Sequence, residues 1–348
     1  MRAAAIALVA LQTSGCYLMQ AAGGQLDVAR RSRPIEEVVR EEKTPQSLRE
    51  RLALVVAARE FAVRELALPD GRSYREYAQL DRPYALWNVV ATREFSLEPR
   101  KSCFPITGCV AYRGYFRQAD AVDEGRKLRN RGYDVSVGGV ATYSTLGHLR
   151  DPVFSTMLAW PESRLVNTIF HEMGHEKLYV SGDTAFNEAY ATVVADAGLR
   201  AWLTSRGNEQ ELERVATSAV RAKAFSELLR AARIRLAALY ARDLDGADMR
   251  IEKNREFGRL KFEYSKLRAQ WGGYTGYDAW FARALNNADL VAVATYDDCV
   301  PGLERELSAA GSIAAFHARA AELGRLTLAQ RHAAVCDAAA TPVVQPTR

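Results

Sequence analysis

The sequence predicts an α+β protein, with a small sheet in its N-terminal part and a largely helical C-terminal half. Short runs of strand-forming residues, each bounded by Pro, Gly or charged residues, occur between positions 85 and 140. Beyond position 205 the apolar residues recur at helical spacing. Strands with an intervening helix, followed by a mostly helical remainder, are typical of the α+β class.

The composition is that of an ordinary globular protein. The chain has 348 residues, of which 48% are hydrophobic and 26% charged, and this excludes a disordered chain, collagen and a coiled-coil rod. A chain of this length can form one large domain or two smaller ones. The net charge is only +5, from 47 basic and 42 acidic residues that alternate along the sequence, so we expect no nucleic-acid partner.

The N-terminus has the layout of an export signal. Arg2 precedes an apolar run over residues 3–11, which is too short to cross a bilayer that needs about 20 residues. The following Ser14-Gly15-Cys16 resembles the lipobox of bacterial lipoproteins, in which the cysteine is acylated. We therefore expect a signal peptide over residues 1–15 and a lipid anchor on Cys16. The alternative is a simple signal peptide with an incidental cysteine.

The segment after this cysteine is small and polar, and we interpret residues 16–33 as a lipidated tether. Tyr17 stands next to Cys16. By analogy with bacterial lipoproteins, the absence of Asp at this position indicates the outer membrane. The expected location is therefore the bacterial cell envelope, facing the periplasm, with the membrane as a partner through Cys16.

The elements of the N-terminal half follow from proline positions and from the apolar pattern. Pro34 and Pro45 each stand where a helix can begin. We expect helices over residues 35–42 and 44–68, strands over 86–90, 108–116 and 133–140, and a helix over 119–130 between the last two strands.

The C-terminal half begins with a long helical pattern. Residues 209–271 predict a helical hairpin that is broken near 243–248, and helices resume after a Gly/Tyr-rich loop and continue to 335. We interpret the charge alternation of the hairpin as a solvated face rather than a binding surface. The expected organisation is an N-terminal and catalytic region over 34–204, a helical region over 205–340 and a polar tail over 341–348.

Four cysteines remain besides Cys16, and an exported chain favours disulfides over metal thiolates. Four cysteines allow three connectivities, of which the local one pairs Cys103 with Cys109 and Cys299 with Cys336. The second bond would close a loop long enough to contribute roughly 3–4 kcal/mol. The alternative is four buried thiols.

The segment from His171 to His175 contains the motif HExxH. On a helix, residues four apart lie on one face, so His171 and His175 can bind one zinc ion. Glu172 then lies beside the ion, where it can accept a proton from the activated water. The remaining histidines are isolated and are expected at the surface or in ordinary hydrogen bonds; they are His148, His317 and His332.

Catalytic zinc usually has three protein ligands and one open position. Glu188 is expected in the opening turns of the next helix, from which it can face the histidines. The alternative ligand is Asp183, which we expect to be a helix cap whose replacement by Asn costs at most about 1 kcal/mol. A metzincin site is excluded, because no further histidine precedes His317. Asp196 is either a partner of a ligand histidine or a simple surface residue.

Two resemblances support this interpretation. The HExxH motif with a downstream Asn187-Glu188-Ala189 resembles the gluzincin zinc peptidases. Blocks along most of the chain resemble the bacterial putative aminopeptidase family of exported zinc peptidases. These blocks are Gly15-Cys16-Tyr17, Gly24-Gln25, Arg33-Pro34-Ile35, Cys103-Phe104-Pro105, Gly108-Cys109, residues 143–147, the HExxH segment, residues 183–188 and Asn286-Asn287-Ala288. The resemblance implies a zincin-like catalytic core that contains the HExxH helix, Zn²⁺ as cofactor and peptides as substrates.

The predicted function is a zinc-dependent peptidase, with aminopeptidase activity implied by the resemblance and Glu172 as the general base. Candidate donors to the oxyanion are Tyr274, Tyr277 and Tyr296, and candidate acidic groups for a free α-amine are Asp151, Glu176 and Asp183. Residues 141–144 can offer a strand edge to an extended peptide. The alternative is a lipid-anchored binding or assembly protein with a structural or vestigial zinc site, and Glu172 weighs against it because a structural zinc needs no base.

Overall fold

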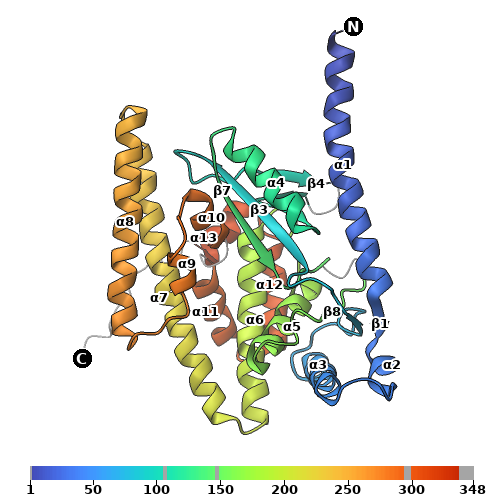
Figure 1. Cartoon of the computed structure of the whole chain (residues 1–348). Helices are drawn as coiled ribbons and strands as arrows, with labels where there is room; N and C mark the ends of the chain where they lie inside the picture. Colours follow the sequence, from blue (N-terminus) through green and yellow to red (C-terminus); the bar gives the residue numbers. More distant parts are fainter. Residues whose placement is uncertain (1, 105–107, 146–148, 294–298, 337–348) are drawn as a thin grey trace, which may run out of the picture.

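The computed structural model describes residues 2–104, 108–145, 149–293 and 299–336, and these form an α+β protein (Figure 1). The predicted polar tail, His148 and Tyr296 lie outside the described residues. Among the helices that the structure describes, none has the length and apolar character needed to span a bilayer.

The N-terminal helix α1 runs over Arg2–Arg31 and points away from the body of the molecule at its start (Figure 1). Its second half packs on the protein. The Tyr17 hydroxyl donates to the Gly114 carbonyl over 3.1 Å, and Val28 is buried in the main core. The segment predicted as a tether is therefore helical and partly docked, because its few large side chains contact the strands beside it.

Three small sheets follow. β1 (Ser32–Pro34) pairs antiparallel with β2 (Glu76–Ala78), which pairs parallel with β8 (Val153–Phe154). In the second sheet, β3 (Leu86–Arg93) lies between β6 (Arg113–Tyr115) and β7 (Tyr133–Val140), and both pairs are antiparallel. The third is the hairpin of β4 (Ser102–Phe104) and β5 (Gly108–Val110).

The prediction of one strand over residues 108–116 is wrong. The segment divides into β5 and β6, which belong to different sheets. Cys109 lies opposite Cys103 in the β4–β5 hairpin, and the two form a disulfide, whereas Tyr115 pairs with Trp87 of β3. The chain must therefore change direction between the two strands, and a continuous run of strand-forming residues does not show this.

Helices cover both faces of the β6–β3–β7 sheet (Figure 1). On one face, α4 (Gln118–Arg129) packs Ala121 and Leu128 against Trp87 and Val135. On the other face, α10 (Asn287–Val293) contacts β3 and β7. The predicted strand over 133–140 and the helix that precedes it are confirmed.

The main core combines helices from both halves of the chain. It contains α2 (Ile35–Arg40), α3 (Gln46–Glu65), α5 (Glu162–Lys177), α6 (Thr184–Ser205), α11 (Val300–Ala310), α12 (Ile313–Gly324) and α13 (Leu328–Val335). A disulfide between Cys299 and Cys336 joins the start of α11 to the end of α13. Both predicted disulfides are therefore confirmed, and the C-terminal helices share a core with α5 and α6.

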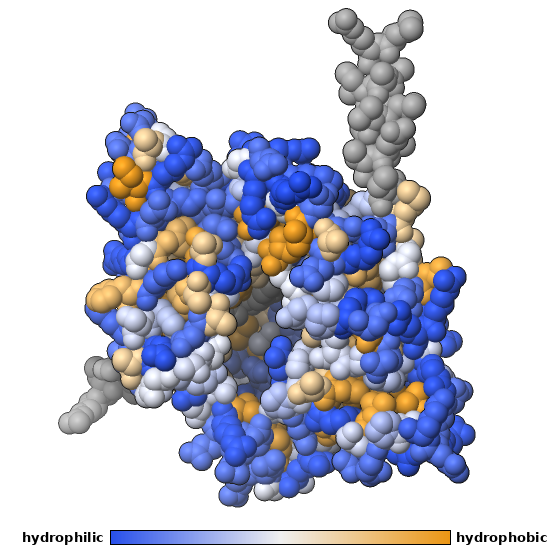
Figure 2. All heavy atoms as spheres, viewed as in Figure 1, coloured by the Kyte–Doolittle hydropathy of each residue, from blue (hydrophilic) through white to orange (hydrophobic). Residues whose placement is uncertain are grey.

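The predicted hairpin is also present, as α7 (Glu209–Tyr240) and α8 (Gly246–Gln270). Together with α9 (Asp278–Phe281) it has its own apolar cluster, which includes Leu229, Leu260 and Phe281. The Lys253 ammonium, at 2.6 Å from Asp134 of β7, connects the hairpin to the sheet. Figure 2 shows that the surface is hollowed between this hairpin and the part of the molecule that carries α5.

Candidate metal centre

The motif HEMGH lies in the last half of α5. The helix is held in the main core by a fully buried apolar face that includes Leu165, Ile169 and Phe170. Gly174, between the two histidines, permits a close crossing with α6, since an added Cβ would lie 3.3 Å from the Cα atom of Ala191. The crossing brings the first turns of α6 opposite the histidines.

The side chains of His171, His175 and Glu188 converge at this crossing. The two histidine Nε2 atoms lie 3.2 Å apart. The Glu188 Oε2 atom lies 3.2 Å from Nε2 of His171 and 3.6 Å from Nε2 of His175. Ligands placed tetrahedrally around zinc at 2.0–2.2 Å are separated by about 3.3–3.6 Å. Two imidazole nitrogens and one carboxylate oxygen at these separations therefore fit one zinc ion with an open fourth position.

The electrostatics of the group suit a cation. Burial acts to raise the pKa of Glu188, but the hydrogen bonds from His171 and His175 outweigh burial and bring the pKa down to about 2. Burial likewise acts to lower the pKa of His171, but the hydrogen bond to Glu188 and the charge of Glu172 raise it above the ordinary value. Glu188 is thus a carboxylate at neutral pH, as zinc binding requires.

Glu172 follows the first histidine on α5 and lies beside the three converging side chains. Burial raises the pKa of its carboxyl group, and the nearby His171 and His175 oppose this effect without cancelling it. A carboxyl group with a raised pKa, next to a site for a metal and a water, is suited to accept and return a proton.

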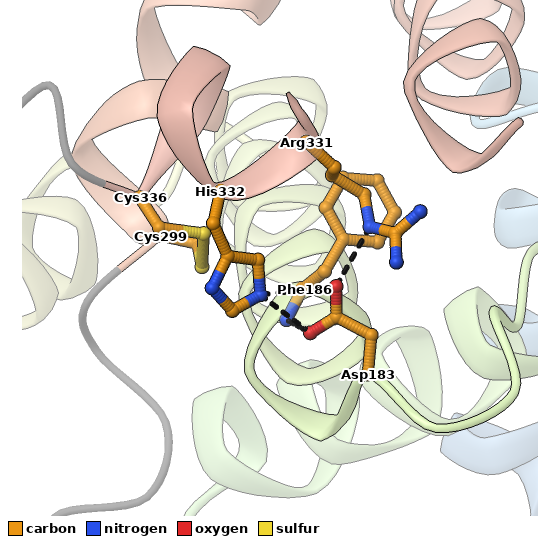
Figure 3. Close-up of a disulfide and its surroundings, with 6 residues drawn as sticks. All are labelled: Asp183, Phe186, Cys299, Arg331, His332 and Cys336. Atoms are coloured by element: carbon orange, nitrogen blue, oxygen red, sulfur yellow. Dashed lines mark hydrogen bonds and ion pairs between the residues drawn. A yellow bond between two sulfur atoms is a disulfide. The ribbon is translucent and has the colours of Figure 1, made fainter. Parts of the chain in front are cut away.

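Asp183 is not part of the group formed by His171, His175 and Glu188, and Figure 3 shows it beside Arg331 and His332 instead. Its carboxylate accepts from the Phe186 backbone N–H, which caps α6, and forms ion pairs with Arg331 at 2.7 Å and His332 at 3.0 Å. Asn187 lies in the first turn of α6 and holds the loop that precedes this helix. Its amide group bonds both the N–H and the carbonyl of Val180 and so closes the loop ahead of Glu188.

A second group of metal-ligating residue types occurs at Cys299, His332 and Cys336. Its two cysteines form the disulfide of Figure 3, so they offer no thiolate, and His332 is bound to Asp183. This group fits no metal ion.

The remaining predicted residues have structural partners. Asp196 on α6 accepts a hydrogen bond from the side-chain amide of Asn167 over 2.9 Å, and Asn167 lies one turn before His171 on α5. His317 bonds the Tyr190 hydroxyl and the Leu66 carbonyl, as expected for an ordinary hydrogen-bonded histidine. Asp151 accepts from the side chains of Ser144 and Thr145 and so holds that loop.

Two of the tyrosines proposed as oxyanion donors, Tyr274 and Tyr277, pack on aromatic residues of the hairpin region. Tyr277 stacks on Phe225 with ring centroids 4.1 Å apart, and Tyr274 packs on Trp271 under the guanidinium of Arg221. Neither is therefore placed by the structure beside the three converging side chains.

Tyr112 is a tyrosine that sequence reasoning missed. It lines a cavity with Gly138, Gly139 and Val140 of β7. Burial raises the pKa of its hydroxyl, and the negative charges of Glu188 and Glu172 raise it further. The hydroxyl is thus within electrostatic reach of both carboxylates. The only sequence signal was its place just after Cys109, in a segment that looked like a continuous strand.

Comparison with known proteins identifies a family. The sequence profile of the family described as "Putative aminopeptidase" matches residues 16–335. The chain belongs to this family. No curated protein and no solved structure matches the chain. The family description points to a peptidase.

Proposed function

We propose that this protein is a zinc-dependent aminopeptidase. The observation that carries the proposal is the convergence of His171, His175 and Glu188 at separations that fit one zinc ion, with Glu172 beside them. The family description supports a peptidase. This arrangement of two helices, one with HExxH and one with a downstream glutamate, is the one expected for a zincin-like core of the gluzincin kind.

His171, His175 and Glu188 would hold the metal. Zinc bound there supplies a Lewis acid for the peptide carbonyl and lowers the pKa of water. Glu172 accepts a proton from the attacking water and delivers it to the leaving amine as the C–N bond breaks. Tyr112, which lines the cavity beside β7 and whose pKa is raised by burial and by the charges of Glu188 and Glu172, would donate a hydrogen bond to the carbonyl oxygen, where negative charge develops.

The strand β7 offers a surface for the substrate. Within the described residues it pairs with β3 along one edge only, and Gly138, Gly139 and Val140 line the cavity next to Tyr112. An added Cβ at Gly138 would meet no atom within 4 Å, so there is open space at this position. An extended peptide can pair with such an edge through its backbone.

The aminopeptidase specificity is supported by the family description. Two of the acidic residues considered for a free α-amine already have protein partners, since Asp183 pairs with Arg331 and Asp151 holds Thr145. Glu176 is the remaining one, on α5 one turn after Glu172.

The proposed location is the bacterial cell envelope. An export signal and a lipobox-like Cys16 support a periplasm-facing lipoprotein of the outer membrane. The alternative, a binding or assembly protein with a structural or vestigial zinc site, is not favoured, because the family description points to a peptidase and a structural zinc needs no base such as Glu172.

The proposal is tested with purified protein of measured zinc content and pairs of peptides that differ only in acetylation of the N-terminus. We expect hydrolysis of the free peptides and little or none of the acetylated partners. Equal hydrolysis of both peptides would still support peptidase activity but would exclude a requirement for a free N-terminus. No hydrolysis of either by protein that holds one zinc per chain would contradict the enzyme.

A further inference from the structure

Tyr74 is the buried tyrosine whose hydroxyl the fold leaves without a partner. Its side chain is 1% exposed, and within the described residues its hydroxyl makes no hydrogen bond. Leaving a buried polar group unpaired destabilises the folded state, because the group loses its hydrogen bonds to water. Phe would fill the same space without this cost, so the hydroxyl requires an explanation.

The backbone holds Tyr74 in an unusual conformation. Its φ angle is +60°, a left-handed value that is strained for a residue other than glycine. Its N–H donates to the Asp151 carbonyl over 2.7 Å. Arg59, itself buried, donates to the carbonyls of Ser73 and Gly71 and so fixes the segment that leads to Tyr74. The segment is therefore anchored from both sides in this conformation.

The same segment packs against the face of α5 that carries the catalytic glutamate. At Gly71 an added Cβ would lie only 2.5 Å from the Glu176 Oε2 atom. Glu172 is one turn earlier on the same face of α5. The segment 71–74 is thus in contact with this face of the helix.

The groups that act on the Tyr74 hydroxyl are carboxylates. Burial has the largest effect and raises the pKa of the hydroxyl. The negative charges of Glu172, Asp151 and Glu176 raise it further, with effects that decrease in this order. Asp151 already accepts from Thr145 through both carboxylate oxygens. Glu172 lies on the face of α5 that the segment 71–74 contacts, and it is the carboxylate on that face that carries the proposed proton transfer.

We propose that Tyr74 is a positioning residue for Glu172, whose carboxylate accepts a hydrogen bond from the buried Tyr74 hydroxyl and keeps its other oxygen directed at the attacking water. Hydrogen bonds of catalytic groups are often long without substrate and tighten in the complex. The unpaired hydroxyl and the left-handed backbone of Tyr74 destabilise the fold, and their role is then to orient the general base Glu172. The kinetic part of this inference rests on the proposed function.

The first test is Tyr74→Phe, with Tyr77→Phe as the matched control. Tyr77 is also buried, lies three residues further along in β2, and its hydroxyl bonds Gln79. For Tyr74→Phe we expect kcat to fall about 10- to 100-fold, as for other positioning groups around a metal site, with KM, zinc content and the denaturation midpoint unchanged or the midpoint slightly raised. For Tyr77→Phe we expect kcat to stay within a factor of about two while the midpoint falls.

An unchanged kcat in Tyr74→Phe would overturn the inference. A reduced kcat together with lost zinc or a lowered denaturation midpoint would also overturn it, since both indicate a structural role instead.

The second test does not depend on turnover or on zinc. In metal-free protein labelled with ¹³C at the ζ carbon of tyrosine, the Tyr74 signal is assigned by its loss in Tyr74→Phe. We expect Glu172→Gln to shift this signal, because a neutral amide replaces the carboxylate, and to leave the Tyr77 signal in place. An unmoved Tyr74 signal would overturn the contact. If the wild type proves to have no peptidase activity, the proposed function fails, and this measurement still decides whether Tyr74 contacts Glu172.

Discussion

Replacement of Asp183 by Asn separates the two roles that this residue could have. Asn has nearly the same shape and can still accept the Phe186 N–H at the start of α6, so the cap itself is kept. The substitution removes the negative charge that faces Arg331 and His332 (Figure 3). The variant therefore distinguishes two roles of Asp183: a partner in a buried ion pair, whose loss lowers stability, and a metal ligand, whose loss lowers zinc content.

The magnitude follows from burial. Asp183 and Arg331 are each 3% exposed, and their charged atoms are 2.7 Å apart. Removing one partner of a buried ion pair costs about 3–5 kcal/mol, because the other charge stays buried and unpaired. Arg331 keeps its hydrogen bonds to the carbonyls of Gly324 and Leu326, so we expect about 3 kcal/mol. The expectation of at most about 1 kcal/mol from the sequence is corrected, because it counted only the cap.

The assay is denaturant unfolding of the two proteins, with zinc content measured on each. Asp245→Asn is the matched control, since Asp245 caps α8 through the N–H groups of Ala247 and Asp248 on an exposed turn. We expect a loss of less than about 0.5 kcal/mol for the control, and unchanged zinc content in both variants. Zinc lost in Asp183→Asn with a stability loss below about 1 kcal/mol would refute the reasoning and make Asp183 a ligand.

The pH dependence gives a further check on the same variant. Burial acts to raise the pKa of Asp183, but hydrogen bonds from His332 and Arg331 outweigh it and lower the pKa below the ordinary value of 3.8. A lowered pKa in the folded state means that the carboxylate stabilises the protein above the unfolded pKa, and that this stability is lost as the pH falls through the folded value. The difference between wild type and Asp183→Asn should therefore be constant at neutral pH and shrink below about pH 4.

Three further predictions concern the metal and the anchor. Glu188→Gln replaces an anionic ligand by a neutral one, so zinc affinity measured by competition with a chelator should fall by well over 100-fold; a smaller change would remove Glu188 from the ligand set. Because the pKa of His171 is raised above 6.5, protons compete with zinc near neutrality, and zinc affinity should increase from about pH 6 to 8; a flat profile would contradict this. Cys16→Ser should abolish the partition of the protein with membranes, which fractionation measures; a wild type that is fully soluble would reject the lipid anchor.

Sequence reasoning succeeded where the determining signals are local. The strand over Tyr133–Val140 and the helix Gln118–Arg129 before it follow from apolar pattern and turn residues. The break between α7 and α8 is visible in the polar run that contains Asp245, which caps the second helix. The two disulfides join cysteines that are 6 and 37 residues apart, the nearest pairing available.

Within the candidate site, the spacing of His171 and His175 already places both on one helix face, and the short loop to α6 limits where Glu188 can lie. The surroundings of these residues could not be predicted in the same way. Asp183 meets Arg331 and His332 across 148 and 149 residues, and no pattern in the sequence marks such a contact.

The tyrosines show the same limit. A tyrosine has one hydroxyl and no motif, so its role depends on which way the fold turns it. Tyr274 and Tyr277 were candidates because they lie in the C-terminal half, yet Tyr277 belongs to the hairpin's apolar cluster and Tyr274 packs on Trp271 at its edge. Besides burial, the charge of Glu172 raises the pKa of both Tyr112 and Tyr74, residues that lie 60 and 98 positions before it in the sequence, and no sequence pattern indicates this.

The most direct test of the central claim is kcat/KM of Glu172→Gln on a peptide with a free N-terminus, at the same zinc occupancy as the wild type. Gln keeps the size of the side chain and removes the base, and Glu172 is not among the three groups that converge as ligands. We predict one zinc per chain in both proteins and a loss of about 100- to 10,000-fold in kcat/KM, the range for removal of a general base. Undiminished hydrolysis by Glu172→Gln with zinc bound would contradict the account.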